Sequence, residues 1–286
     1  MNEELSLDEI GHWTEIKLEI IKKYAKAYSK ILSSKSPIKK YVYIDAFAGA
    51  GVHKLKVTGK LVPGSPQIAL NIEPPFNEYY FIDLDGQKIQ NLKKISEDRN
   101  NVFVYEGDCN EILLDKVFPR VRYEDYHRGL CLLDPYGLHL DWNVIKKAGE
   151  MRSIEIFLNF PAHDINRNVL WTNLKNLKPT QIRRMNLFWG DDSWIKIIYR
   201  EEENLFKETE QKKIAKLKSL LPEYKSRLVN IAGFKFVPEP IPMLNTKGGL
   251  LYYLYFASPN QTGARITNDI FNKYKNTNIE QWLEPK

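Results

Sequence analysis

Apolar positions along the chain follow two periods, which predict alternating helices and strands. In residues 13–33 the spacing is close to 3.6 residues, as in an amphipathic helix, with an apolar face formed by Trp13, Ile16, Ile20, Tyr24, Ala27 and Ile31. Residues 41–51, YVYIDAFAGAG, begin as an apolar run and end in small residues, which predicts a buried strand leading into a glycine turn. Further buried strands are predicted at 79–85, 102–108, 129–137 and 154–161, and helices at about 86–97, 110–117 and 141–149.

This alternation predicts an α/β fold with a parallel sheet built from βαβ units. Two later apolar runs, 234–243 and 250–258, predict two more strands, and Gly248 and Gly249 between them suit a tight antiparallel return. A last helix is expected at about 264–274. The expected organisation is an N-terminal basic helix (1–40), an α/β core (41–163 and 229–286) and a helical insertion (164–228).

Composition places the chain among ordinary globular proteins. Of its 286 residues, 43% are hydrophobic and 27% are charged, which excludes a disordered or fibrous chain. No apolar run is long enough to span a membrane, and the acidic N-terminus lacks a signal-peptide pattern. The two cysteines, Cys109 and Cys131, provide neither a disulfide framework nor a zinc site. We therefore expect a cytoplasmic protein without a metal of its own, and the oligomeric state stays open.

The net charge of +6 is mild, but the Lys and Arg residues gather in two regions, 13–40 and 164–227. Two basic regions on a nearly neutral body are compatible with a nucleic-acid surface, and equally with solvated helix faces. The second region also contains Trp171, Trp189 and Trp194, which suit contacts with bases, internal packing or docking of a protein partner.

Aspartates recur at the ends of the first four predicted strands: Asp45, Asp83, Asp108 and Asp134. Ligands of open α/β sheets bind at this edge, where the carboxyl ends of parallel strands meet. Each aspartate alone is also explained as a helix N-cap. Four in succession, the first followed by a glycine turn, favour a ligand site.

A cationic nucleoside with a ribose is the ligand that these residues suggest. Gly49 and Gly51 permit close approach of the backbone, in a turn that also contains Asp45 and Phe47. Asp83 is placed to accept hydrogen bonds from ribose hydroxyls, with Asp85 as the second choice. Asp108 is placed to accept from the amino group of an adenine.

Two competing nucleotide sites fit less well. A dinucleotide motif needs a third glycine where Lys54 stands, and Asp83 follows Gly51 by 32 residues, against about 20 in that motif. The 45–51 turn has no Lys or Arg to hold a triphosphate, and no Walker A loop is present.

The ordered segments YIDAFAGAG, YYFIDLD, EGDC and LLDPYG resemble the motifs of class I S-adenosylmethionine-dependent methyltransferases. More specifically, the chain resembles the three-Cys-motif partner protein (TcmP) family, through features that run from the first helix to the late strand 250–258: Trp13, Lys17 and Tyr24, the 45–51 turn, Gly64-Ser65-Pro66, Asp83-Leu84-Asp85, Asp134 to Gly137, Asn159-Phe160-Pro161 and Asp164 to Arg167. The resemblance implies a Rossmann-like, mostly parallel seven-stranded sheet with an antiparallel last strand. It also implies S-adenosylmethionine as the cofactor, and a three-cysteine-motif protein as a partner.

The segment Asp134-Pro135-Tyr136 is the catalytic candidate. In amino-methylating nucleic-acid enzymes, an acidic or amide residue with two prolines and an aromatic residue follows the fourth strand; here one proline is missing. Asp134 and the Pro135 carbonyl could accept from the target amine, while Tyr136 stacks on the base. Asn159 and Phe160, after the fifth strand, are candidates to line the acceptor pocket.

The sequence therefore predicts a methyltransferase that acts on an amino group in nucleic acid. Two alternatives stay open: a cofactor-binding accessory subunit of a three-cysteine-motif protein without turnover of its own, and a methyltransferase for a small molecule.

Overall fold

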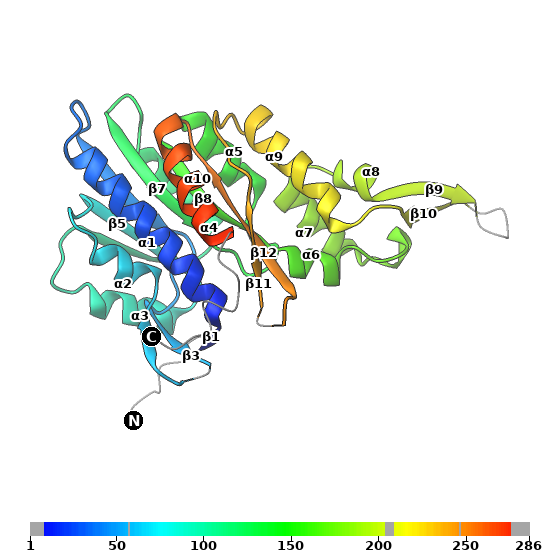
Figure 1. The fold of residues 1–286 in the computed structure, drawn as a ribbon, viewed down its shortest axis with the longest axis horizontal. Helices are drawn as coiled ribbons and strands as arrows, with labels where there is room; N and C mark the ends of the chain where they lie inside the picture. Colours follow the sequence, from blue (N-terminus) through cyan, green and yellow to red (C-terminus); the bar gives the residue numbers. More distant parts are fainter. Residues whose placement is uncertain (1–8, 57, 204–208, 246, 276–286) are drawn as a thin grey trace.

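A seven-stranded sheet covered by helices on both faces forms the body of the protein (Figure 1). The computed structural model describes residues 9–56, 58–203, 209–245 and 247–275. The outer ends of the predicted first and last segments, 1–8 and 276–286, lie outside these residues, as do 204–208 within the predicted insertion.

The strand order of the main sheet confirms the predicted fold class. Across the sheet the order is β11 (Ile241–Leu244), β12 (Leu250–Ala257), β8 (Ile154–Phe160), β7 (His127–Leu133), β2 (Lys40–Asp45), β5 (Glu78–Asp83) and β6 (Val102–Glu106). The strands from β8 to β6 pair in parallel. The last strand, β12, lies between β8 and β11 and is antiparallel to both. This is the mostly parallel seven-stranded sheet, with an antiparallel last strand, that the sequence predicts.

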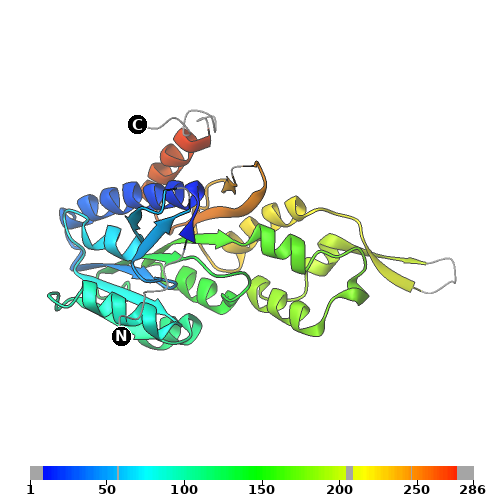
Figure 2. The same cartoon turned by 90° about the horizontal axis from the view of Figure 1, so that it is seen from below.

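Helices divide between the two faces according to which apolar cluster they enter. One face buries side chains of α1 (His12–Ser33), α2 (Ser65–Leu70), α3 (Gly86–Ile95) and α10 (Gln261–Lys275). The other face buries those of α4 (Cys109–Ile112), the π-helical turn η1 (Leu113–Val117), the short turn η2 (Phe118–Arg120) and α5 (Trp142–Met151). Helices α1 and α10 lie side by side in both views (Figures 1 and 2).

The region predicted as a helical insertion contains helices and one pair of strands. Its helices are α6 (Ala162–Asn168), η3 (Leu174–Asn176), α7 (Pro179–Trp189), α8 (Trp194–Ile198), η4 (Leu217–Ser219) and α9 (Leu220–Asn230). The antiparallel strands β9 (Tyr199–Glu203) and β10 (Thr209–Lys213) project from the body (Figure 2). Their segments YREEE and TEQKK lack apolar alternation, so the sequence pattern does not reveal them.

The tryptophans of this region mostly serve packing. Trp189 and Trp194 are fully buried, so neither ring is available to a nucleic acid, whereas Trp171 is 46% exposed. The buried Arg227 lies against the rings of Trp142 and Trp189, at 5.1 and 5.3 Å from their centres, and binds Asp191 at 2.9 Å. This contact joins α9 to α7 of the same region and to α5 of the body.

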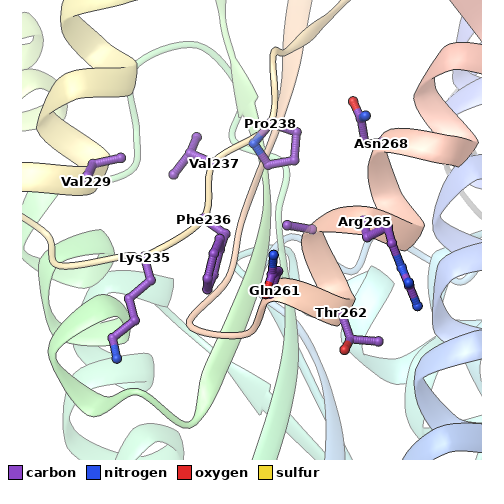
Figure 3. A pocket seen from close by; sticks show the side chains of 10 residues that line it. Val229, Lys235, Phe236, Val237, Pro238, Gln261, Thr262, Arg265 and Asn268 are labelled. Carbon is purple, nitrogen blue, oxygen red and sulfur yellow. The ribbon is translucent and has the colours of Figure 1, made fainter.

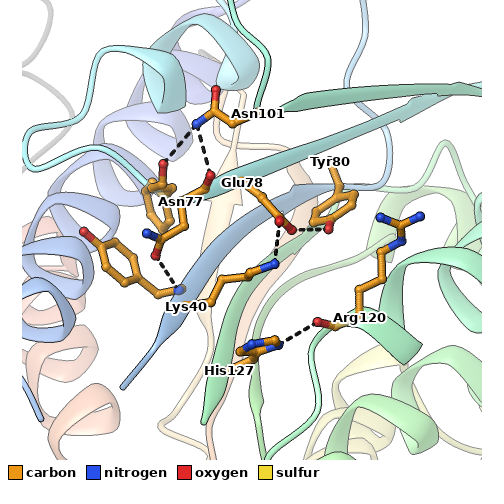
Figure 4. A network of polar contacts seen from close by, with 9 residues as sticks. Lys40, Asn77, Glu78, Tyr80, Asn101, Arg120 and His127 are labelled. Carbon is orange, nitrogen blue, oxygen red and sulfur yellow. Dashed lines mark hydrogen bonds and ion pairs between the residues drawn. The ribbon is translucent and has the colours of Figure 1, made fainter. Parts of the chain in front are cut away.

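A polar network holds the amino ends of the central strands in register (Figure 4). Glu78 of β5 accepts hydrogen bonds from Lys40 of β2 and from the hydroxyl of Tyr80. The Asn77 side chain accepts from the backbone N–H of Tyr41 at 2.8 Å. The opposite ends of these strands carry the loops described below.

A small three-stranded sheet flanks the main sheet. Strands β1 (Glu9–Ile10), β3 (Val52–Leu55) and β4 (Leu61–Pro63) form a separate sheet beside the loop after β2.

Within the described ranges, no helix has the length and apolar character needed to cross a bilayer.

A glycine in α5 marks the closest approach between two segments. A Cβ added to Gly149 would lie 2.0 Å from the carbonyl oxygen of Ala232. Alanine usually stabilises a helix relative to glycine by about 1 kcal/mol. Here the added Cβ would collide with backbone, which cannot rotate away, so alanine should destabilise the protein instead.

We therefore expect Gly149→Ala to lower the free energy of unfolding by about 2 kcal/mol or more, measured by urea denaturation. Gly86→Ala is the matched control in α3, because its Cβ would meet only the flexible end of Glu106. Equal stability of the two variants would contradict the close approach.

A buried carboxyl group joins α1 to the sheet. Glu155 of β8 accepts hydrogen bonds from the hydroxyl of Tyr24 in α1 and from that of Ser258, the latter at 2.8 Å. Burial raises the pKa of Glu155 to about 7, although both hydrogen bonds act to lower it. The folded protein therefore keeps a proton that the unfolded chain releases above pH 4 to 5.

Because the folded state binds this extra proton, the contribution of Glu155 to stability falls as pH rises from about 4.5 to 7. The neutral variant Glu155→Gln should remove this part of the pH dependence. Between pH 4.5 and 8, we expect the loss of unfolding free energy to be smaller in the variant by about 3 kcal/mol. Superimposable stability–pH curves would show that Glu155 is ionised in the folded protein.

Candidate functional site

The carboxyl ends of β2, β5, β6 and β7 surround one cavity of about 250 Å³, which we call the nucleoside cavity after the ligand that the sequence predicts for this edge. Each of these strands contributes a residue that the sequence singled out: Phe47 after β2, Asp83 at the end of β5, Asp108 after β6 and Tyr136 after β7. The described residues that line it include two aspartates and no lysine or arginine. Its walls therefore favour a neutral or cationic ligand over a triphosphate.

Asp83 connects the glycine turn to the end of β5. Its Oδ2 accepts a hydrogen bond from the backbone N–H of Gly49 at 2.7 Å, and its Oδ1 accepts from the N–H of Asp85 at 3.0 Å. Each carboxylate oxygen has a second acceptor position. Asp83 can thus fix the turn and still accept a hydrogen bond from a ligand in the nucleoside cavity.

Two further acidic candidates, Asp85 and Asp108, cap helices, and only one of them lines the cavity. Asp108 caps α4 by accepting from the Asn110 N–H at 2.8 Å, and it lines the nucleoside cavity. Asp85 caps α3 through the Gln87 N–H at 2.9 Å; it is exposed and is not among the cavity residues. The geometry therefore favours Asp83 over Asp85 as the ligand-facing carboxylate.

The glycines of the turn are explained by backbone conformation and packing. Gly49 and Gly51 both have positive φ, at 63° and 77°, a region that residues with a Cβ rarely adopt. A Cβ on Gly51 would also lie 2.6 Å from Ile95 of α3. Gly51 therefore allows α3 to pack against the turn, while Gly49 provides the N–H that binds Asp83.

Beside the cavity, Asp134 forms a buried charge pair with a lysine of the first helix. Its Oδ2 accepts from the ammonium of Lys17, and its Oδ1 accepts from the side-chain amide of Asn159. The side chain of Lys17 is 8% exposed and that of Asp134 is 27% exposed. Burial by itself would lower the pKa of Lys17, but the charge and hydrogen bond of Asp134, together with the charges of Tyr252 and Asp45, outweigh it and raise that pKa. Lys17 is therefore a cation wherever Asp134 is an anion.

Asp45 lies beneath this pair and is fully buried. Burial raises its pKa to about 7, and the nearby charge of Asp134 adds to the increase. Hydrogen bonds from Ser65 and from the Phe47 N–H, together with the charge of Lys17, act in the opposite direction. Asp45 thus supports the start of the turn from below and is not among the residues that line the nucleoside cavity.

The segment after β7 presents an aromatic ring at the surface. Tyr136 is 64% exposed and lines the nucleoside cavity, whereas Pro135 is buried. The ammonium of Lys88 lies 5.6 Å from the centre of the Tyr136 ring. A flat, exposed ring next to Asp134 can take part in stacking.

The two candidates after β8 have different positions. Asn159 is buried and binds Asp134. Phe160 is fully buried among Phe188, Tyr224 and Tyr255, with ring centres 4.9–6.0 Å apart. Phe160 therefore belongs to the aromatic core, and of the two only Asn159 adjoins the site.

In the described part of the chain, no group of three or more His, Cys, Asp or Glu residues is arranged to hold a metal ion. Cys109 lines the nucleoside cavity but is largely buried, which raises the pKa of its thiol to about 12. Cys131 is fully buried, and burial raises its pKa also.

Comparison with known proteins supports the fold. No protein-family model and no curated protein matches the sequence. Protein LPL1258 from Legionella pneumophila, described with the family DUF519, aligns over 90% of this chain and 92% of its own, with a TM-score of 0.50 and 13% identity. Two further solved structures are more distant. One is a putative methyltransferase from Thermobifida fusca, which aligns over 85% of this chain and 81% of its own, with a TM-score of 0.39 and 14% identity. The other is M. jannaschii TYW2 in complex with AdoMet, which aligns over 82% of this chain and 74% of its own, with a TM-score of 0.34 and 11% identity.

Removal of the Lys17 charge tests the buried pair. Lys17→Met should lower the free energy of unfolding by about 2 kcal/mol or more, because Asp134 loses its counter-charge in a largely buried position. The exposed Lys22→Met in the same helix is the matched control and should be nearly neutral.

The double variant Lys17→Met/Asp134→Asn separates the ion pair from simple packing. We expect it to be more stable than the sum of the single changes indicates, by at least about 1 kcal/mol. Strict additivity of the two changes in urea denaturation would rule out a direct interaction.

Proposed function

We propose that this chain is an S-adenosylmethionine-dependent methyltransferase that acts on an amino group in nucleic acid. The observation that carries the proposal is the convergence of Phe47, Asp83, Asp108 and Tyr136 on one cavity at the carboxyl edge of the sheet. A methyltransferase-like fold with this edge free for a nucleoside supports the same conclusion.

The residues present fit the cofactor. Asp83 has acceptor capacity for ribose hydroxyls beyond its two backbone contacts, and Asp108 has the same for an adenine amino group. The absence of basic residues among the described lining suits a ligand with a positive sulfonium. When bound, this cofactor supplies an electrophilic methyl group.

At the acceptor side, separate roles fall to Asp134, Tyr136 and Lys17. Asp134 is partly exposed and accepts a hydrogen bond from the target amine, which orients the nitrogen lone pair. Lys17 and Asn159 hold the carboxylate in one position. The exposed ring of Tyr136 stacks on the base that carries the amine. The basic residues of α1 and the insertion then attract the nucleic acid strand.

One observation favours the second candidate, a cofactor-binding accessory subunit. Both oxygens of Asp134 already accept a hydrogen bond within the chain, which leaves less capacity for a target amine. In this alternative the chain resembles TcmP proteins in function as well, and acts in the cytoplasm with a three-cysteine-motif partner that supplies the chemistry.

Two variants test cofactor binding. Calorimetry with S-adenosylmethionine should show saturable binding, which Asp83→Asn weakens by about tenfold or more through loss of a charge-assisted hydrogen bond. Asp85→Asn is the matched control, because it removes the same charge two residues away at an exposed helix cap. Absence of binding, or equal effects of both variants, would refute the proposed cofactor site.

Transfer is tested separately with labelled S-adenosylmethionine and total RNA, DNA and a metabolite extract. Label in nucleic acid that Asp134→Asn abolishes without loss of cofactor binding supports the enzyme. Label only in the extract identifies a small-molecule acceptor. Cofactor binding without label in any fraction favours the accessory subunit.

A further inference from the structure

The opposite edge of the sheet carries a second cavity, of about 410 Å³, which we call the arginine cavity. Its defining residues are Tyr28, Lys35, Arg128, Arg152, Glu155 and Lys235. They lie near the end of α1, at the start of β7 and around the turn into β8, whereas the residues of the nucleoside cavity follow the strands. The two cavities therefore lie at opposite edges of the parallel strands, and no residue of the nucleoside cavity contributes to the arginine cavity.

Positive charge is concentrated in this cavity. Four basic side chains line it, and Glu155 is the sole carboxylate among the described lining residues. The guanidinium groups of Arg128 and Arg152 both lie against the ring of Tyr123, at 4.0 and 5.3 Å from its centre. Within the described residues, the side chain of Arg152 has no ion pair or hydrogen bond. Arg128 donates to the carbonyl oxygens of Tyr123 and His127, at 3.4 and 2.6 Å, and within the described residues it too has no ion pair. Two neighbouring cations without an ion pair favour the binding of an anion.

Two residues with strained backbone conformations also lie at the arginine cavity. Tyr126 and Arg152 have positive φ, at 61° and 57°, and among the described residues no other non-glycine residue has. Both line the arginine cavity. Arg152 occupies the left-handed position after α5, where glycine is the usual residue. Strained residues gather at ligand sites, because binding can compensate for the cost that they impose on the fold.

The floor of the cavity is polar and unlike that of a simple anion site. The hydroxyl of Tyr28 is buried and has no hydrogen-bond partner among the described residues. Glu155 lies beside it, buried and with a raised pKa, so at neutral pH a large fraction carries a proton. A bare phosphate would fill little of about 410 Å³, a volume typical of pockets for organic ligands.

From these observations we propose that the arginine cavity binds a nucleoside monophosphate, with the phosphate held by Arg128 and Arg152 and the nucleoside directed to the floor at Tyr28 and Glu155. The monophosphate is either a free nucleotide or one unit of a nucleic acid strand. The site is separate from the cofactor site and does not depend on the proposed function.

A neighbouring cavity of about 750 Å³ gives a strand a path beyond this unit (Figure 3). Lys235 lines both cavities, and Arg265 of α10 lines the larger one. Pro259 and Asn260 line one cavity and Gln261 the other, so this short turn separates them. A second phosphate that passes Lys235 would reach the surface near Arg265.

The test is a titration of the full chain with guanosine and uridine monophosphates, followed by calorimetry and NMR, with guanosine and inorganic phosphate for comparison. These nucleotides avoid the adenosine that the cofactor site would take. Arg152→Gly should weaken binding by about tenfold or more, while it raises the melting temperature because the strain is relieved. Arg152→Lys keeps the charge and should bind more tightly than the glycine variant.

Arg122→Ala is the matched control, since Arg122 is exposed in the same loop, pairs with Asp125 at 3.7 Å and does not line the cavity. Asp83→Asn should leave this binding unchanged, which separates it from the cofactor site. Three results would overturn the proposal: no saturable binding of either monophosphate, equal losses in Arg152→Gly and Arg122→Ala, or phosphate alone binding as tightly as the nucleotides.

A single-stranded RNA pentamer distinguishes the two sources. If the natural ligand is a strand, the pentamer binds more tightly than the monophosphates, and Arg265→Ala weakens the pentamer alone. If it is a free nucleotide, the monophosphates bind at least as tightly and Arg265→Ala changes neither. If Arg152→Gly does not change the binding of the pentamer, the strand binds elsewhere, and the path through the arginine cavity past Lys235 is refuted.

Discussion

Burial of the Lys17 ammonium against Asp134 is the interaction on which the geometry of the carboxyl edge depends. Lys17 belongs to α1 and Asp134 follows β7, so the pair joins the first helix to a loop 117 residues away in the chain. An isolated charge in such a buried position is unfavourable, and each group therefore requires the other. The apolar face of α1 packs on the sheet, and the pair fixes the loop with Asp134 and the exposed Tyr136 to that helix.

The two edges of the same sheet have opposite electrostatic character. Carboxylates follow the strands at one edge, where Asp83 and Asp108 line the nucleoside cavity. Cations gather at the other, where Arg128 and Arg152 line the arginine cavity. Parallel strands make this separation possible, because all their carboxyl ends meet at one edge and all their amino ends at the other. The proposed anionic ligand and the proposed cationic cofactor would therefore occupy separate cavities.

Local patterns in the sequence predict most of the fold and part of the site. The strands are recognised because each is a short apolar run between turns, and parallel pairing then brings Asp83, Asp108 and the segment around Tyr136 to one edge. The same reasoning ranks Asp83 before Asp85 but does not exclude Asp85, since both follow one strand. Only the structure shows that Asp85 caps α3 in solvent while Asp83 binds the glycine turn.

Contacts between distant segments account for what the pattern does not reveal. Lys17 falls on the apolar face of its helix, four residues after Trp13 and three before Ile20, and a lysine at such a position signals a buried counter-charge. That signal indicates a partner but not which one, because Asp134 is only one of many acidic residues. The arginine cavity is harder still to predict from the sequence, because α1, β7 and the turn before β8 meet there only after the sheet has formed. Periodicity reports which residues are buried, whereas a site is defined by which buried and exposed groups come together.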